Sequence, residues 1–489
     1  MLPFMSNINR FAVIALLSGS VCVVASPTQA RPAEGYVVAV DSRTAEHQEW
    51  MEAARALCRK HAGRLETYPK GNTDDLLSAL RSARPRYVCF VSMPECVGRE
   101  LVVGAAQTLR KIDEDPYGDA IWGIVTGYDA ADAMRMATRG EPFVVRRAAT
   151  SMGGQGFFKE WESGFASDEG NRNRFWVKPA GAQEAVCNEV APDPAKALAE
   201  AFNRIPVDYW CTSGHARERN WQIVFNQNAG FVVHRDGGLF ACDSAGTAFP
   251  FRSPNAKVYV AAGNCLIGHI DKRDCMTTAW IHSGGVDQMV GYTVVTFYGF
   301  MGWGTKGLFE SGRFSLAESF FLSNQLLLWK LGRKNPSLLK KVVDAKGEFS
   351  PKAMVEGLRG SVRSQDEFGL FWDRDTVAFY GDPAWRVTCP EERKNVETAV
   401  RGDRIEVRFL RETAFPDSPD SKEMKPVAVF LPEPPQPGTQ VVEAGTGKPV
   451  DGAVVTESFA LLPVLGRRAA GESLNFKLET KNNRKGGQK

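Results

Sequence analysis

The 489-residue sequence has almost no long apolar runs, and the single exception lies at its N-terminus. Arg10 precedes an apolar stretch, Phe11 to Ala25, that is short for a membrane span and typical of a secretory signal. Small residues at Thr28 and Ala30 predict cleavage after Ala30, with Ala25 as the alternative site and an uncleaved anchor as the alternative interpretation. We therefore expect a signal peptide over 1–30 and a secreted or periplasmic mature chain without a stable membrane span.

The chain also lacks a strong excess of either charge. Its 60 basic and 57 acidic residues give a formal net charge of +3, which falls by one if Arg10 is removed. So small a bias gives no basis for nucleic-acid binding, which needs clustered positive charge. With 43% hydrophobic and 24% charged residues, the composition is that of an ordinary globular protein. It excludes a disordered chain, a collagen and a coiled-coil rod.

No Cys-x-x-Cys pair occurs, so a structural zinc site of the usual spacing is not expected. Of the ten cysteines, Cys22 belongs to the predicted signal, which leaves nine in the mature chain. An odd number in a secreted protein leaves at least one thiol unpaired. That thiol is either an inert buried side chain or a nucleophile that must stay reduced, and the count does not decide between them.

Short apolar runs alternate with amphipathic segments along most of the mature chain. The first part is predicted to contain strands at 36–41, 87–91 and 120–125 and helices at 44–61, 74–83, 101–112 and 130–137. After a loop-rich stretch near 151–176, strands are predicted at 207–211, 257–261 and 288–293 and helices at 194–203, 274–283 and 316–331. Glycine-containing turns between Trp221 and Phe249 predict a small antiparallel insertion. The alternation predicts an α/β fold with a mostly parallel sheet flanked by helices.

Helix periodicity is lost after Cys389. The alternating and proline-rich segments that follow predict a small all-β domain over 390–480, and the basic residues 481–489 predict a disordered tail. We therefore divide the mature chain into an N-terminal α/β half-domain at 31–175, a second half-domain at 176–389 and this β domain.

Histidine is scarce, so each possible base for a cysteine nucleophile can be considered in turn. Four of the six histidines have ordinary structural explanations, in a first helix, in the hairpin insertion or at a helix end: His47, His61, His234 and His282. His215 and His269 remain. His269 lies four residues after Cys265, so Cys265, His215 and His269 are an alternative zinc ligand set. A packing role for His269 against Asp271 is favoured over that set.

His215 and Cys265 each follow a predicted apolar strand. The carboxyl ends of neighbouring parallel strands share one edge of a sheet, which would bring a base and a nucleophile together. Gly214 and Gly263 lie where the backbone must bend close to a substrate. Backbone N–H groups near Gly214 and at Cys265 would then form an oxyanion hole. The alternative is a buried thiol and a structural histidine.

Aromatic residues alternate with glycine between Gly291 and Gly304. Such a segment suits a mobile wall that binds a substrate side chain, and an ordinary buried strand and turn is the alternative.

Four ordered motifs resemble the caspase-like cysteine peptidase clan, and within it the gingipain-type peptidases. They are His215 and then Cys265 after successive strands, Asp115-Pro-Tyr-Gly-Asp119 before a strand ending at Val125, the helix and glycine turn from Ala279 to Thr293, and Gly381-Asp382-Pro383. The resemblance covers roughly residues 37–387. It implies a caspase-like fold in two half-domains, followed by an Ig-like β-sandwich. It also implies a Cys-His dyad, with His215 as general base or acid and Cys265 as nucleophile.

The sequence departs from that family at three places. His-Gly is replaced by His215-Ala216, Asn264 precedes the nucleophile, and Gly123-Ile124 stands where the family has Gly-Arg. Ala216 and Asn264, with Gly214, are the residues expected to shape the oxyanion hole. No third catalytic residue transfers. The weak candidates to orient His215 are Asp115, Asp119 and Asn220.

The main hypothesis is a secreted cysteine endopeptidase that hydrolyses peptide bonds in a protein or peptide substrate. No cofactor is expected to be required, no metal is expected in the catalytic site, and the resemblance leaves room for a structural calcium ion. The rival from another class is a caspase-fold binding or scaffold protein without activity, which the residues at Ala216 and Asn264 favour. A metal-dependent hydrolase is the third and less favoured hypothesis.

Overall fold

A computed structural model describes residues 35–171, 173–189, 194–224, 229–253, 255–343, 350–358 and 360–480. The predicted signal peptide at 1–30 and the predicted tail at 481–489 lie outside the described residues. In the described part of the chain, no helix is both long enough and apolar enough to span a bilayer.

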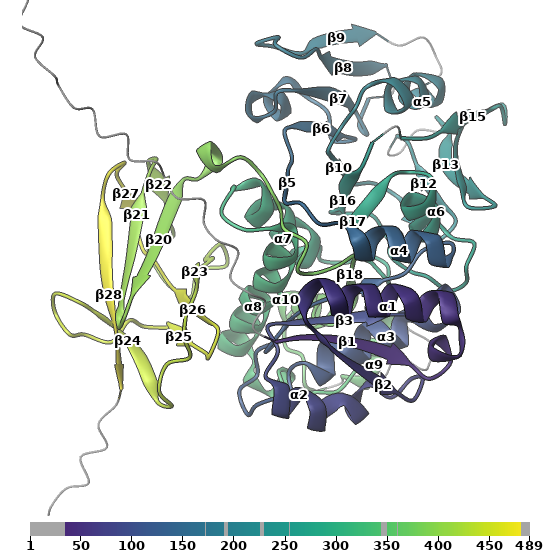
Figure 1. The fold of residues 1–489 in the computed structure, drawn as a ribbon. Helices are drawn as coiled ribbons and strands as arrows, with labels where there is room; N and C mark the ends of the chain where they lie inside the picture. The colour runs from purple at the N-terminus through teal and green to yellow at the C-terminus, as the bar shows by residue number, and fades with distance from the viewer. Residues whose placement is uncertain are drawn as a thin grey trace, which may run out of the picture. The chain divides into compact units, whose positions relative to one another are not determined.

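Twelve strands form one sheet in the order β2-β1-β3-β4-β18-β17-β16-β10-β6-β7-β8-β9 (Figure 1). They are β1 (Tyr36–Asp41), β2 (Arg64–Tyr68), β3 (Tyr87–Val91), β4 (Ile121–Val125), β6 (Arg147–Thr150), β7 (Ser163–Ser167), β8 (Arg174–Lys178), β9 (Val186–Glu189), β10 (Tyr209–Thr212), β16 (Lys257–Ala261), β17 (Val286–Tyr292) and β18 (Val377–Tyr380). All neighbours pair in parallel except β17 with β18, β7 with β8 and β8 with β9. The predicted α/β fold with a mostly parallel sheet is confirmed.

Helices cover this sheet because its central strands are apolar on both faces. Every residue of β1, β4, β16 and β17 is buried, which an open sheet achieves only with a layer on each side. The helices are α1 (Gln48–His61), α2 (Leu77–Ala83), α3 (Pro94–Thr108), α4 (Ala130–Thr138), α5 (Pro194–Arg204), α6 (Met276–His282), α7 (Phe300–Glu310), α8 (Leu316–Lys334), α9 (Pro351–Gly357) and α10 (Gln365–Asp373). The predicted helices flanking the two candidate catalytic segments correspond to α5 and α6.

The predicted antiparallel insertion is a five-stranded sheet next to the candidate site. It consists of β11 (Ala216–Arg217), β12 (Asn220–Gln222), β13 (Phe231–Arg235), β14 (Gly238–Cys242) and β15 (Ala248–Phe251). Asp236 and Gly237 join β13 to β14, with φ angles of 47° and 73°. Two successive positive φ angles are those of a type I′ turn, which matches the twist of a hairpin. The Asp-Gly turn signal in the sequence was therefore sufficient to predict this hairpin.

The stretch near 151–176 was predicted to be loop-rich, and this was wrong for β7 and the start of β8. The sequence of β7, Ser-Gly-Phe-Ala-Ser, has no β-branched residue, yet all five residues are buried. Gly164 has a φ of 149°, and a Cβ there would overlap the carbonyl oxygen of Ala148 in β6. β7 therefore pairs unusually closely with β6, and small residues rather than β-propensity make that contact.

The Gly381-Asp382-Pro383 motif builds a buried polar hub. The Asp382 carboxylate accepts hydrogen bonds from Tyr36 Oη and Lys60 Nζ, both at 2.8 Å, and lies 2.8 Å from His61 Nε2. These partners hold the pKa of Asp382 at about 2, well below its usual range, although burial opposes them. The hub joins α1 to the end of β18, so the motif is structural.

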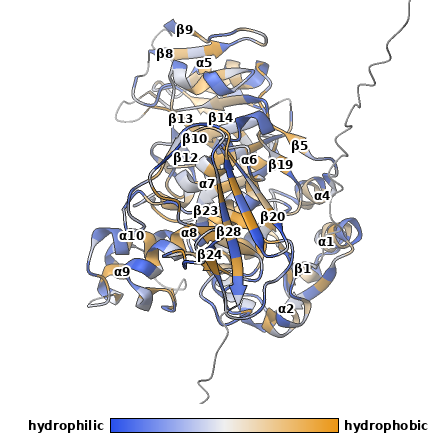
Figure 2. Ribbon diagram, turned by 90° about the vertical axis from the view of Figure 1, so that its left-hand side faces the viewer, coloured by the Kyte–Doolittle hydropathy of each residue, from blue (hydrophilic) through white to orange (hydrophobic). Residues whose placement is uncertain are grey.

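The region after Cys389 is a sandwich of two antiparallel sheets with its own core, which confirms the predicted all-β unit. One sheet has the order β20 (Val396–Arg401), β21 (Arg404–Phe409), β28 (Ser473–Thr480), β24 (Thr439–Glu443), and the other has β23 (Val427–Phe430), β26 (Phe459–Leu462), β25 (Val454–Val455). Figure 2 shows hydrophobic and hydrophilic residues alternating along β20 and β28, as expected for strands with one face in water. Two short pairs, β22 (Thr413–Ala414) with β27 (Arg467–Arg468) and β5 (Phe143–Val144) with β19 (Val387–Thr388), complete the strands.

Strand β26 takes part in two cores at once. Phe459 and Leu461 belong to the main core of the α/β part, whereas Ala460 and Leu462 belong to the core of the sandwich. Successive side chains of a strand point to opposite faces, so one strand can serve both. Phe459 packs edge-on against Phe321 of α8, with ring centroids 5.7 Å apart.

Candidate functional site

The two predicted catalytic residues follow adjacent parallel strands. β10 pairs with β16 in a register that places Thr212 opposite Ala261, the last residue of each strand. His215 comes three residues after β10, and Cys265 comes four residues after β16. Because parallel strands end at the same edge of a sheet, the two loops leave the sheet side by side.

Asn264 ties these two loops together. Its side chain is fully buried and accepts a hydrogen bond from Thr212 Oγ1 at 2.5 Å. Its amide nitrogen donates to the carbonyl oxygens of Ser213 at 2.9 Å and Gly214 at 3.2 Å. Asn264 directly precedes Cys265, and Gly214 directly precedes His215. The side chain expected to shape the oxyanion hole is therefore a clamp between the loops, and its amide is engaged by backbone.

Two glycines permit this close approach. A Cβ at Gly263 would lie 2.5 Å from Ser213 Oγ, so a larger residue would push the loops apart. Gly214 has a φ of 100°, a conformation that other residues rarely adopt. Both glycines were singled out from the sequence: Gly263 leaves room for the Ser213 side chain, and Gly214 permits the positive φ angle before His215.

Cys265 lies in a turn that is stabilised by hydrogen bonds with the segment after β17. Its half-buried thiol accepts a hydrogen bond from the backbone N–H of Thr296, at 3.3 Å. Leu266, which follows, has a φ of 54°, an uncommon conformation for a branched residue. Its N–H donates to Val294 at 2.9 Å, so the segment after β17 fixes the turn. The hydrogen bond to Val294 stabilises this uncommon backbone conformation directly after Cys265.

Each of the two loops offers a backbone donor. Within the part of the chain that the structure describes, the N–H groups of Gly214 and Cys265 donate no hydrogen bond. Ala216, the first residue of β11, is buried and pairs with Trp221. It is absent from the positive-φ residues, so alanine fits without backbone strain where the resembling family has glycine. His215 itself is exposed, and its carbonyl accepts a hydrogen bond from Gln222 at 2.8 Å.

The remaining cysteines are poor candidates for a nucleophile. All nine cysteines of the described residues are free thiols, so Cys265 is not held in a disulfide there. Burial raises the pKa of seven of these thiols: Cys58, Cys89, Cys96, Cys211, Cys242, Cys275 and Cys389. Cys187 is exposed on the edge strand β9. It is the one fully exposed cysteine of the described residues, so a labelling experiment has to remove it, whereas Cys58 and Cys242 are half-buried like Cys265.

The described residues provide no ligand set for the alternative zinc site. Among the described residues, no group of three metal-ligating side chains contains Cys265, His215 or His269. Burial, with a contribution from the Arg99 cation, lowers the pKa of His269 to about 4. His269 is therefore a neutral side chain at physiological pH. It lines a cavity of about 310 Å³ together with Lys70 and Arg99.

Glu169 is a site residue that the sequence analysis missed. A Cβ at Gly214 would lie 3.4 Å from Glu169 Oε2, so this carboxyl group stands beside the His215 loop. Ser151 links the two, because its hydroxyl accepts from Ser213 N at 3.1 Å and donates to Glu169 Oε2 at 3.5 Å. Burial raises the pKa of Glu169 to about 7. Glu169 follows β7, a strand that the sequence analysis did not predict because its residues are small and not β-branched.

Asp115 and Asp119 lie elsewhere. They precede β4, which is four positions from β10 in the sheet, so about 19 Å separates the two strands. Asp113 and Asp119 bring carboxylate oxygens within 4.8 Å of Glu457 in the sandwich. Burial and the Glu457 carboxyl raise the pKa of Asp119 well above its usual range, and its Oδ2 is buried without a partner among the described residues. An all-oxygen set of this kind fits a hard cation such as calcium.

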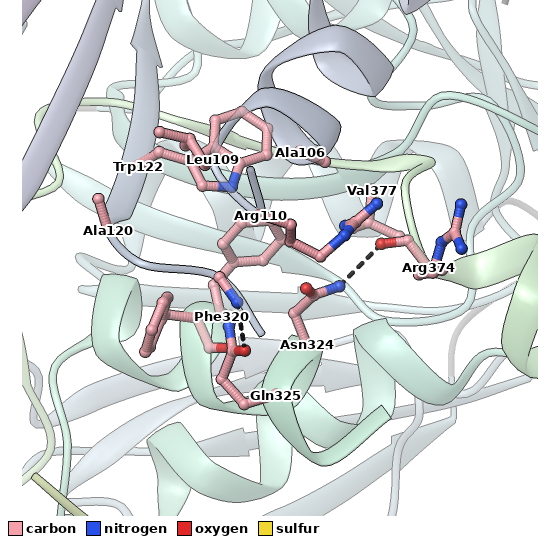
Figure 3. A pocket seen from close by; sticks show the side chains of 12 residues that line it. Ala106, Leu109, Arg110, Ala120, Trp122, Phe320, Asn324, Gln325, Arg374 and Val377 are labelled. Atoms are coloured by element: carbon pink, nitrogen blue, oxygen red, sulfur yellow. Dashed lines mark hydrogen bonds between the residues drawn. The ribbon is translucent and has the colours of Figure 1, made fainter. Parts of the chain in front are cut away.

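The other candidates are explained by structural contacts. His234 lies 2.9 Å from Asp274, and His282 lies 2.9 Å from Asp132. Asn220 opens β12, where it pairs with Arg217 across a tight hairpin. A second cavity, of about 20 Å³ between α3, α8 and β4, has room for one water molecule (Figure 3). Neither cavity is lined by His215 or Cys265.

No protein-family profile and no curated protein matches the chain. Among solved structures, the Arg-specific cysteine proteinase gingipain R matches with a TM-score of 0.37 and 11% identity, over 92% of this chain and 93% of that one. A structure described only as a protease matches with a TM-score of 0.33 and 9% identity, over 92% and 98% of the two chains. Likenesses of this size carry no functional argument. The functional proposal therefore rests on the residues of this chain.

Proposed function

We propose that the protein is an exported cysteine endopeptidase with a Cys265–His215 dyad. The observation that supports this most is the Asn264 clamp. Asn264 directly precedes Cys265, and its side chain binds Gly214, which directly precedes His215. A merely structural cysteine and histidine would not need their loops fixed to each other by a buried amide. The N–H of Thr296 supports the same role, because it would stabilise negative charge on the sulfur.

The residues divide the reaction between them. Cys265 Sγ attacks the carbonyl carbon of the peptide, and the oxyanion is bound by the N–H groups of Cys265 and Gly214. His215 takes the thiol proton and gives it to the leaving amine as the C–N bond breaks. A water molecule, deprotonated by His215, then hydrolyses the thioester and releases the thiol. No metal takes part in any of these steps.

Glu169 supplies a preference to the proposed peptidase. Its half-buried carboxyl group beside Gly214 is placed to pair with a cationic side chain of the residue whose carbonyl is attacked. A bound cation would favour the ionised form of Glu169 and lower a pKa that burial raises to about 7. We therefore expect cleavage after lysine or arginine.

The carboxylates Asp113, Asp119 and Glu457 are proposed to hold a structural calcium ion. The ion would neutralise three neighbouring acids, one of which has a buried oxygen without a partner among the described residues. It would connect the loop before β4 to the sandwich and would take no part in the chemistry.

The proposal is tested with a thiol-directed reagent on a Cys187→Ser background. Iodoacetamide should modify Cys265 faster than the five buried thiols and faster than the half-buried Cys58 and Cys242, whose pKa is raised. Peptide mapping identifies the modified site. Cys265→Ala should abolish both labelling and hydrolysis of a fluorogenic peptide library with little change in melting temperature. His215→Ala should suppress hydrolysis, while weak labelling at high pH persists. Absence of hydrolysis together with an unreactive Cys265 would favour the scaffold hypothesis. N-terminal sequencing of exported protein should find Arg31 first.

A further inference from the structure

The first part of the sheet has a strand order that creates a ligand crevice. β1 lies between β2 and β3 in the order β2-β1-β3-β4, so the chain leaves β1 in one direction and β3 in the other. Because crossovers between parallel strands are right-handed, the connections that follow β1 and β3 lie on opposite faces of the sheet. The loops after these two strands therefore separate, and sheets of this order bind ligands where they separate, at the carboxyl ends of the strands.

The cavity of about 310 Å³ lies at this crevice. Its walls include Asp41 at the end of β1, Tyr68 at the end of β2 and residues 95–101 of α3, the helix that follows β3. The volume equals that of about ten molecules of liquid water, which is the lower end of the range for small-molecule sites. The strand order and the cavity thus indicate the same place, and that place is separate from the dyad because neither His215 nor Cys265 lines the cavity.

Tyr68 directs an unpartnered hydroxyl toward this cavity. The residue is only 3% exposed, and its ring packs edge-on against Phe90, with centroids 6.0 Å apart. Among the described residues its hydroxyl has no hydrogen-bond partner, although a buried tyrosine usually has one. The groups that act electrostatically on the hydroxyl, Asp41 and Cys96, line the same cavity. The hydroxyl is therefore a donor for an acceptor atom of a ligand.

Charged groups of both signs line the cavity without pairing with one another. Lys70 Nζ donates to the main-chain carbonyl oxygen of Glu95 at 3.2 Å, not to its carboxylate. In the described part of the chain, the carboxylates of Glu95 and Glu100 form no ion pair and accept no hydrogen bond. Asp41 differs, because its carboxylate accepts four hydrogen bonds from its neighbours. A ligand that carries both charges would satisfy the lysine and the two glutamates, whereas a purely anionic ligand would be repelled by the glutamates.

Two residues that line the cavity also contact the turn of Cys265 or the segment that fixes it. His269 follows Cys265 by four residues and donates its backbone N–H to the carbonyl oxygen of Leu266 at 2.9 Å. Arg99 Nη2 donates to the carbonyl oxygen of Thr293 at 2.8 Å, and Thr293 begins the segment after β17 that fixes this turn. A molecule that contacts both Arg99 and His269 would therefore hold the two segments together.

We propose that this cavity binds a free amino acid as a zwitterion, and that the bound molecule stabilises the turn that carries Cys265. The carboxylate of the amino acid would accept hydrogen bonds from the Lys70 ammonium group and the Tyr68 hydroxyl. Its ammonium group would pair with the carboxylates of Glu95 and Glu100. The site does not depend on the proposed peptidase function, because binding needs no reaction at Cys265 and a free amino acid has no peptide bond to cleave.

The test measures binding of each standard amino acid to the full-length protein by thermal shift and isothermal titration calorimetry. At least one amino acid should bind and raise the melting temperature by about 2–4 °C at saturation. Its N-acetyl and amide derivatives each lack one charge and should bind about tenfold more weakly. Lys70→Met should weaken binding about tenfold and Tyr68→Phe about threefold to tenfold. Tyr209→Phe is the matched control, because the Tyr209 hydroxyl is also buried without a partner among the described residues but lies outside the cavity.

Hydrogen exchange measures the effect on the turn. The backbone amides of Leu266 and Thr296 should exchange more slowly when the amino acid is bound, and unchanged exchange would refute the stabilisation of the turn. The zwitterion site itself is wrong if no amino acid binds, or if inorganic phosphate or the uncharged derivatives bind equally well. It is also wrong if neither Lys70→Met nor Tyr68→Phe weakens binding. An inactive protein with an unreactive Cys265 that still binds the amino acid would refute the peptidase function alone.

Discussion

Replacing Asn264 tests the proposed function at a residue that does not touch the substrate. Asn264→Ala removes the donor to the carbonyl oxygens of Ser213 and Gly214. Ser213 keeps a second donor, the indole of Trp221 at 3.1 Å, whereas Gly214 loses the donor that the clamp supplies. Lost hydrogen bonds and an unsatisfied carbonyl together cost about 2–3 kcal/mol in the free energy of unfolding, which urea titration measures.

The kinetic effect should be of similar size. If the loops move apart by about 1 Å, kcat/KM should fall about a hundredfold, which corresponds to about 2.7 kcal/mol. The fall should appear mainly in kcat, because Asn264 positions Cys265 and His215 without binding the peptide. Asn264→Asp should be worse than alanine near neutral pH, because a carboxylate would face two carbonyl oxygens. It should recover in part at acid pH, where a protonated acid can donate one hydrogen bond.

A matched control separates positioning from stability. Asn335 is also buried, and it donates to Ser361 and Glu367, both at 2.8 Å, far along the chain from the dyad. Asn335→Ala should lose similar stability while kcat/KM and the rate of Cys265 labelling stay within about twofold of wild type. If Asn264→Ala leaves both quantities as unchanged as the control does, the clamp is not a positioning device and the reasoning is wrong.

Four further outcomes follow from the charged groups. Burial raises the pKa of Glu169 to about 7, so the stability that this residue contributes below about pH 4.5 is lost as pH rises through 7. Glu169→Gln should therefore raise the melting temperature at pH 8 and leave it nearly unchanged at pH 5. The same variant should lower kcat/KM for peptides with arginine at the attacked residue more than for leucine peptides. Asp382→Asn should lower the free energy of unfolding at pH 7 by about 3–5 kcal/mol, measured by urea titration. The pKa of Asp382, about 2, means that its ion pairs stabilise the protein above about pH 4 and that this stability is lost as pH falls through 2. EGTA should lower the melting temperature of wild type but not of Glu457→Gln, and equal shifts would remove calcium from that cluster.

The strands that carry the dyad could be predicted because their signal is local. The segment Lys-Val-Tyr-Val-Ala of β16 is apolar and β-branched, and the predicted bounds agree with the structure. The same is true of β1 and of the hairpins with Asp-Gly turns. Adjacency of β10 and β16 then placed His215 and Cys265 at one edge without any side-chain information.

The parts that could not be predicted depend on contacts between distant segments. β7 has no local strand signal and depends on the close contact of Gly164 with Ala148, so Glu169, two residues after it, remained in a predicted loop. Asn264 was recognised as a departure from the family pattern, but its clamp needs the geometry of a second loop. Helix α7 is rich in glycine, which disfavours helices, and packing against Ala262 overrides that preference. Tertiary contacts, not local propensity, decide these places.

The double membership of β26 has a consequence for how the protein can be cut. Phe459 and Leu461 complete the core of the α/β part, so a chain ending at residue 389 would leave Phe321 and its neighbours facing water. Such a truncation would expose apolar surface at about 25 cal/mol for each Å² and would be prone to aggregate. The sandwich is therefore better regarded as part of the α/β core than as an attached module. Calorimetry of the full chain should show the two parts melting in a single cooperative transition.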